Sequence, residues 1–198
     1  MKTLTNNTTT NILSIDIDYA YSPTISVYDD YIEGVRISEE EQELILQEHN
    51  VPKPTCNPEK IKVLESVIKN KINLNAPIIL IENHDQILDF LPNNKQLAIY
   101  NFDHHHDVYY PGWHSLDTLD EGNWVYFLKD KNVLEYIWIR NEDSENMDFD
   151  LPELDFSIEE RYNIENMPMF DLVFFCISSR WTGSTGKQNI MRLIDLIS

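Results

Sequence analysis

Residues 97–107 read LAIYNFDHHHD, an apolar strand that runs directly into a cluster of potential metal ligands. The apolar half of this stretch is typical of a strand that is buried on both faces in a parallel sheet. Side chains two residues apart along an extended chain point to the same side, so His104 and His106 are expected to face away from the others. The spacing predicts one point of convergence for three ligands: Asp103, His105 and Asp107.

Other predicted strands also end in polar residues. Residues 11–18 (NILSIDID) alternate as a strand does, which places two carboxylates on one side, Asp16 and Asp18. A short strand at 77–81 ends just before His84, and residues 171–178 (DLVFFCIS) form another buried strand. In open α/β sheets ligands collect beyond the carboxyl ends of the strands, so these ends predict one shared site.

Helical signals separate the strands. Asn57-Pro58 marks a helix start, and the following residues carry an apolar stripe: Ile61, Leu64, Val67, Ile68 and Ile72. Further helices are predicted at 38–49, 85–91, 123–130 and 187–197, with a strand at 133–140 and an exposed acidic loop at 141–157. This alternation predicts an α/β fold, a three-layer sandwich with a mainly parallel sheet. We expect residues 1–10 to form a short flexible tail and residues 11–198 a single domain.

Charge limits the classes of partner. The chain has 15 Lys and Arg residues against 34 Asp and Glu residues, a formal net charge of -19. Such a surface repels nucleic acids and anionic membranes, and it attracts divalent cations and cationic substrates. Every long apolar stretch is interrupted by polar residues, so no membrane segment is expected. With Cys56 and Cys176 as its two cysteines, the chain has no disulfide framework, and a cytoplasmic location is expected.

The crowded carboxylates require a counter-charge, because like charges held together disfavour ionisation. Two divalent cations would supply it, with bridging carboxylates holding the ions about 3.5–4 Å apart. Oxygen-rich ligation with one or two imidazoles suits manganese better than structural zinc, which prefers thiolate and imidazole. We therefore expect a pair of manganese ions bound chiefly by the following residues: Asp16, Asp18, Asp103, His105 and Asp107.

The motifs resemble those of the arginase/deacetylase superfamily. Its ureohydrolase members bind two Mn²⁺ ions through an Asp-x-His-x-Asp motif, an Asp-x-Asp motif and a separate histidine, which match residues 103–107, residues 16–18 and His84. The wider sequence (SIDIDY, IENHD, NFDHHHD, GNWVYFL and DLVFFCISSRWT) is similar over residues 11–182 to the small peptide-arginase-like proteins. In ordinary arginases the Asp-x-Asp motif comes late in the chain, so the resemblance implies an arginase-like sheet that is circularly permuted.

The resemblance also implies a ligand set for each of two Mn²⁺ ions per chain. The more enclosed ion would be bound by His84, Asp103, Asp107 and Asp16. The second would be bound by His105, Asp103, Asp16 and Asp18, with Asp16 and Asp103 bridging. The implied reaction is hydrolysis of the guanidinium group of an arginine in a precursor peptide, which gives peptidyl ornithine and urea. Segments that grip free arginine are not recognisable, which favours the peptide as substrate.

Further roles follow from that reaction. Asp107 would orient the attacking water, and the proton shuttle to the leaving amine would be His106 or His114. A guanidinium needs a carboxylate partner, for which Glu82 and Glu121 are both candidates. Aromatic side chains can stack on the planar cation, and the candidates are Tyr109, Trp113 and Trp181.

Three alternatives stay open. Asp103-His104-His105 is also similar to the Asp-His-His motif of manganese phosphoesterases, although Asp18 is followed by Tyr19-Ala20 rather than glycine and no Gly-Gly-Gly-His motif occurs. A zinc deacetylase of the same superfold would need one metal and would leave Asp16 or Asp18 unused. A non-catalytic, metal-stabilised binding module is the third alternative, yet it would not need to retain all six expected ligands. The oligomeric state is not predicted.

Overall fold

The computed structural model describes residues 9–22, 44, 47–48, 50, 54–110, 115–144, 147 and 151–197. Within these residues a six-stranded sheet has the strand order β4-β8-β1-β5-β6-β7, and every pair of neighbours is parallel. Its strands are β1 (Thr10–Asp16), β4 (Ile78–Ile81), β5 (Leu97–Phe102), β6 (Val133–Ile139), β7 (Ser157–Arg161) and β8 (Leu172–Cys176). A short antiparallel pair joins β2 (Tyr21–Ser22) to β3 (Thr55–Cys56). The predicted α/β fold with a mainly parallel sheet is confirmed.

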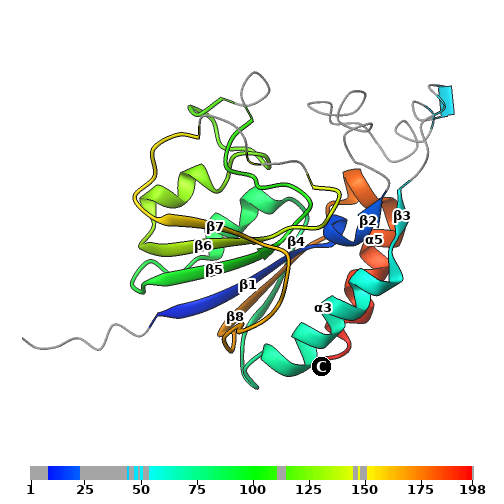
Figure 1. Ribbon diagram of the computed structural model, residues 1–198, viewed down its shortest axis with the longest axis horizontal. Helices are drawn as coiled ribbons and strands as arrows, with labels where there is room; N and C mark the ends of the chain where they lie inside the picture. The colour runs from blue at the N-terminus through cyan, green and yellow to red at the C-terminus, as the bar shows by residue number, and fades with distance from the viewer. Residues whose placement is uncertain are drawn as a thin grey trace, which may run out of the picture.

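Helices connect the strands. They are the α-helices α3 (Pro58–Lys71), α4 (Ile87–Phe90) and α5 (Ser179–Ile194), and the 3-10 helices η1 (Ile17–Ala20), η2 (His84–Gln86) and η3 (Tyr126–Asp130). The helix start predicted at Asn57-Pro58 is confirmed, because the Asn57 side chain accepts a hydrogen bond from the Glu59 backbone N–H. Figure 1 shows α3 and α5 next to each other on one side of the sheet, where they are in contact.

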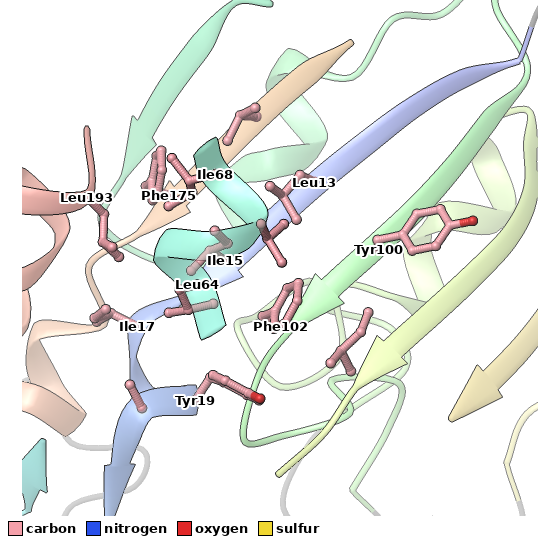
Figure 2. Close-up of a cluster of buried hydrophobic side chains, with 14 of the residues drawn as sticks. Leu13, Ile15, Ile17, Tyr19, Leu64, Ile68, Tyr100, Phe102, Phe175 and Leu193 are labelled. Atoms are coloured by element: carbon pink, nitrogen blue, oxygen red, sulfur yellow. The ribbon is translucent and has the colours of Figure 1, made fainter. Parts of the chain in front are cut away.

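Both faces of the sheet are buried in apolar layers. On one face, residues of α3 and α5, such as Leu64, Ile68 and Leu193, pack over Leu13 and Phe175 of the central strands (Figure 2). On the other face the layer is formed by residues around α4 and η3, with four large members: Ile87, Trp124, Leu128 and Trp138. Strands that are covered on both faces read as continuous apolar runs, which explains the sequences of β5 and β8.

Several boundaries differ from the predictions. The first strand ends at Asp16 rather than at residue 18, because the chain turns into η1 there and the Asp16 side chain caps this turn. Helix α5 starts at Ser179 rather than at Lys187, so the glycine-containing residues 183–186, which precede the predicted start, are also helical. Gly186 permits this, because a Cβ there would lie 1.8 Å from Thr182 Oγ1 and 3.3 Å from Ile17 Cγ2, where α5 approaches η1 closely.

Two edge strands also differ. The strand predicted at 77–81 is not buried on both faces, because β4 is an edge strand whose Ile78 and Leu80 are 37% and 43% exposed. Strand β7 begins at Ser157, the last residue of the acidic loop predicted at 141–157, and its polar sequence SIEER gives no strand signal. The tail at 1–10 and the helix at 38–49 lie largely outside the described residues. No helix in the described part of the chain is both long enough and apolar enough to cross a lipid bilayer.

Candidate metal centre

The predicted metal ligands meet at one edge of the sheet. Because all six strands are parallel, their carboxyl ends share this edge, as expected for a ligand site in an α/β sheet. Asp16 is the last residue of β1, Asp103 follows β5 directly, and His84 comes three residues after β4. β1 lies between β8 and β5 in the sheet, so ligands from distant parts of the sequence become neighbours.

His84 is the centre of the first group of ligand atoms. Its Nδ1 lies 2.9 Å from Asp103 Oδ2, 3.2 Å from Asp107 Oδ2 and 3.5 Å from Asp16 Oδ2. The imidazole is 2% exposed, and its Nδ1 makes no hydrogen bond to these oxygens despite the short distances. Ligand atoms at right angles around a divalent ion, each about 2.1 Å from it, lie about 3 Å from one another. The spacing around Nδ1 therefore fits a shared cation.

A second group lies beside the first. His105 Nδ1 is 3.3 Å from Asp18 Oδ2 and 4.0 Å from Asp103 Oδ1. Ligand atoms of these three residues lie within 4.8 Å of one another, as do those of His84, Asp103 and Asp107. Asp103 therefore presents Oδ2 to the first group and Oδ1 to the second, which is the arrangement of a bridging carboxylate. The single point of convergence predicted for residues 103–107 is wrong, because the chain bends there and forms two groups that share Asp103.

Asp16 differs from Asp103 in how its two oxygens are used. Its Oδ1 accepts a hydrogen bond of 3.1 Å from the Asp18 backbone N–H, while Oδ2 faces His84. Ser178 Oγ also donates to Oδ2 at 2.5 Å. Asp103 Oδ1 also accepts a backbone hydrogen bond, from the His105 N–H at 2.9 Å, but it faces His105 Nδ1 as well, so Asp103 offers one oxygen to each group.

The buried carboxylates have unusual electrostatics. Burial, together with the charges of Asp18 and Asp103, raises the pKa of Asp16 well above its ordinary value. Burial and the charge of Asp107 likewise raise the pKa of Asp103. Burial opposes a charge on His84, but the neighbouring carboxylates of Asp103 and Asp107 outweigh it and raise the pKa of the imidazole well above its ordinary value. The group therefore favours added positive charge, which a divalent ion provides.

Neighbouring side chains hold the ligands in place. Ser14 Oγ lies 2.7 Å from His84 Nε2, the nitrogen that points away from the carboxylates. The Trp124 indole N–H donates to Asp107 Oδ2 at 2.8 Å, and the Asn101 amide donates to Asp103 Oδ2 at 3.0 Å. Partners of this kind orient metal ligands and tune their affinity. Sequence reasoning missed these three residues. The contacts of Ser14 and Trp124 join separate parts of the chain, whereas Asn101 lies two residues before Asp103 and could have been found from that spacing.

The backbone is also constrained here. Asp107 and Ser178 have φ values of 54° and 44°, in the left-handed region that non-glycine residues rarely adopt. Asp107 provides a ligand atom, and Ser178 donates to Asp16. Non-glycine residues in this region tend to occur at functional sites, where the surrounding structure holds them in place.

Two further described histidines, His104 and His106, belong to neither group. His104 Nδ1 is 3.1 Å from the Asn141 amide nitrogen, and burial lowers the pKa of His104 to about 3. His106 stacks on Tyr110 with ring centroids 4.3 Å apart, and its Nδ1 accepts a hydrogen bond from the Val108 N–H. Burial and the charge of His105 lower the pKa of His106 to about 3. His114, the other candidate proton carrier, and Trp113 lie outside the described residues.

The predicted substrate-binding residues lie at different distances from the ligands. The Trp181 ring centroid is 5.8 Å from that of His105. The Tyr110 ring centroid is 6.4 Å from that of His105, and these two rings are arranged edge to face. The exposed carboxylate of Glu82 accepts a hydrogen bond from Ser179 Oγ. Glu121 is partly exposed in the turn that leads to Trp124, and Tyr109 is also partly exposed. Tyr110, rather than its neighbour Tyr109, forms the described contact with His105.

Cys176 belongs to the buried strand that the sequence predicts at 171–178. In the structure it is fully buried, and its ligand atom forms a third group with those of Asp16 and His84, all within 4.8 Å of one another. Burial and the charge of Asp16 raise the pKa of this thiol well above its ordinary value. Its sequence context gave no signal, because its proximity to Asp16 arises from pairing between β8 and β1.

Comparisons of the chain with family models, with curated proteins and with solved structures found no match.

Proposed function

We propose that the chain is a binuclear metal hydrolase that acts on a guanidinium group and converts peptidyl arginine to peptidyl ornithine and urea. The observation that carries this proposal is the pair of ligand groups that share Asp103. All six residues predicted as ligands belong to these groups or lie beside them: Asp16, Asp18, His84, Asp103, His105 and Asp107. We further propose that the sheet is a circularly permuted arginase-like sheet. Asp16 lies at the end of a central strand, beside the other ligands, although its motif comes first in the chain, and a site depends on ligand geometry rather than on the order of its motifs.

The residues fit a pair of manganese ions. The unbonded, buried Nδ1 of His84 indicates that a cation belongs beside it, with Asp16, Asp103 and Asp107 as the other ligands. The second ion would be held by His105, Asp18 and Asp103, with Asp16 as a further ligand. Such ions supply Lewis acidity and lower the pKa of bound water, which is the chemistry that guanidinium hydrolysis requires. Oxygen-rich ligation favours Mn²⁺ over Zn²⁺.

The exposure of the ligands indicates where a substrate would approach. The His105 side chain is 19% exposed, whereas those of His84 and Asp18 are 2% and 1% exposed. Among the described ligands, His105 is therefore the one that a substrate would approach first, and Trp181 and Tyr110 lie close to its ring. A planar guanidinium can stack on such rings, and the net charge of -19 favours a cation over an anion.

The chain's own groups would handle the substrate and its protons. We assign the carboxylate that pairs with the guanidinium to Glu82 or Glu121, and the orientation of the attacking water to Asp107. The proton carrier would be His106 or His114. The burial of His106 against Tyr110, together with its low pKa, speaks against His106 in this role, because a carrier must exchange protons with solvent.

The test is a product assay. Protein loaded with Mn²⁺ is incubated separately with an arginine-containing peptide, with free arginine and with a phosphodiester, and urea and phosphate are measured. We expect urea from the peptide, less urea from free arginine and no phosphate. Asp103→Asn should abolish urea release, whereas Asp130→Asn, an exposed carboxylate outside the ligand groups, should leave it unchanged. Phosphate release without urea would instead support the phosphoesterase alternative. If neither urea nor phosphate were released, the hydrolase proposal would be refuted.

A further inference from the structure

Cys176 lies next to two of the proposed metal ligands, Asp16 and His84. It is the last residue of β8 and is paired in register with Asp16, the last residue of β1. Its Sγ lies 3.4 Å from the Glu82 carbonyl oxygen and 3.4 Å from Ser178 Oγ. The side chain is fully buried, so this thiol is shielded from bulk solvent.

The surroundings of this thiol provide three donors that a soft metal ion could share. A sulfur, an imidazole nitrogen and a carboxylate oxygen lie within 4.8 Å of one another, from Cys176, His84 and Asp16. His84 Nδ1 is buried and makes no hydrogen bond, which independently marks a position for a cation. Thiolate and imidazole ligands are preferred by soft and borderline ions, whereas Mn²⁺ prefers carboxylates and water.

We propose that Cys176 is a conditional ligand that captures thiophilic divalent ions, such as Cd²⁺, Co²⁺ and Zn²⁺, together with Asp16 and His84. When such an ion binds, the metal–sulfur bond forms and the thiol proton leaves to solvent, so that no oxidant or reductant is needed. With Mn²⁺ the thiol stays protonated and outside the ligand set. This inference rests on the proposed metal centre and is independent of the reaction proposed for it.

Capture of a soft ion would compete with the manganese pair. Asp16 and His84 both contribute to the group around His84 Nδ1, so a thiolate-bound ion takes these two ligands from the enclosed manganese site. A single soft ion would therefore exclude the pair. The centre would therefore discriminate between metals by whether or not the Cys176 sulfur coordinates the bound ion.

The chain contains two cysteines, which provides a matched control. Metal-free protein is titrated with Co²⁺, and absorption is recorded in the near ultraviolet, where thiolate-to-cobalt charge transfer is intense, and in the visible range, where cobalt d–d bands occur. We expect charge transfer in the wild-type protein and in Cys56→Ser, but not in Cys176→Ser. Cys56 is half-buried near α5, where the Asn189 amide donates to its sulfur.

Calorimetry provides a second readout. Loss of a thiolate ligand should weaken Cd²⁺ binding at least about tenfold in Cys176→Ser, while Mn²⁺ binding changes by less than about threefold. Retained Mn²⁺ binding by this variant also shows that it is folded. Equal loss of Mn²⁺ and Cd²⁺ affinity would overturn the selective role of the sulfur.

The other spectroscopic outcomes are distinct. Visible cobalt bands without charge transfer in the wild-type protein would overturn the inference and leave the metal centre intact. Charge transfer that depends on Cys56 would also overturn it. An absence of all cobalt bands would refute the metal centre itself, whereas the hydrolase reaction is tested separately by urea release with Mn²⁺.

Discussion

Removing single carboxylates should reveal which ions share a ligand. Each ion present at 100 times its dissociation constant stabilises the folded chain by about 2.7 kcal/mol, so two ions contribute about 5 kcal/mol. For a chain of 150–250 residues, 1 kcal/mol shifts the melting temperature by about 2–4 °C, so manganese should raise it by roughly 10–20 °C. Asp18 belongs to one ligand group and Asp103 to both. Asp18→Asn should therefore keep about half of the manganese-dependent shift, and Asp103→Asn should lose nearly all of it.

Differential scanning calorimetry with excess EDTA or with MnCl₂ measures these shifts. In EDTA both variants should melt no lower than the wild-type protein, because each removes a charge from a crowded group of buried carboxylates. The exposed Asp130→Asn is the control, for which the full shift is expected. If Asp103→Asn kept the full shift, or if Asp18→Asn lost as much as Asp103→Asn, the shared role of Asp103 would be refuted.

Two further substitutions test the surroundings of the centre. Ser14→Ala removes the partner of His84 Nε2 and should weaken Mn²⁺ binding by about 10–100-fold, as measured by calorimetric titration; unchanged affinity would show that Ser14 does not orient the ligand. Gly186→Ala places a Cβ against the Thr182 side chain and should lower the free energy of unfolding by about 1–3 kcal/mol in urea denaturation. Lys187→Ala, at an exposed position on the same helix, is the control, and an equal effect of both substitutions would contradict the close approach of α5 to η1.

The sequence predicts the central part of the fold well, because its signals are local. The apolar runs of β5 and β8 and the capped start of α3 depend on neighbouring residues alone. The start of α5 could not be predicted in this way. Its glycines resemble a turn, and their helical role depends on contact with η1, more than 160 positions earlier in the numbering. Strand β7 is missed for a similar reason, since its polar residues form a strand only through pairing with β6.

The candidate site shows the same division between local and distant information. Two-residue spacing selects five residues that lie in or beside the ligand groups, namely Asp16, Asp18, Asp103, His105 and Asp107, although the chain bends after Asp103 and does not run extended through Asp107. The bend separates the ligands into two groups, which spacing alone does not reveal. Cys176 could be found only from the register between β8 and β1, which brings it beside Asp16.

Charge balance supports our proposal of two ions rather than one at this centre. All four carboxylates are buried: Asp16, Asp18, Asp103 and Asp107. Two described cationic side chains, Lys60 and Arg140, lie near His104, and each is paired with a carboxylate other than these four. Lys60 lies 3.5 Å from Glu142, and Arg140 lies 2.8 Å from Glu160. The four carboxylates carry four negative charges when ionised, which two divalent ions balance fully while the histidines stay neutral. One divalent ion would leave two buried charges uncompensated, a cost that would be met by protonating the carboxylates and losing them as ligands. In the wild-type chain the second ion would therefore favour binding of the first, whereas in Asp18→Asn three carboxylates remain and a single ion would leave only one charge uncompensated.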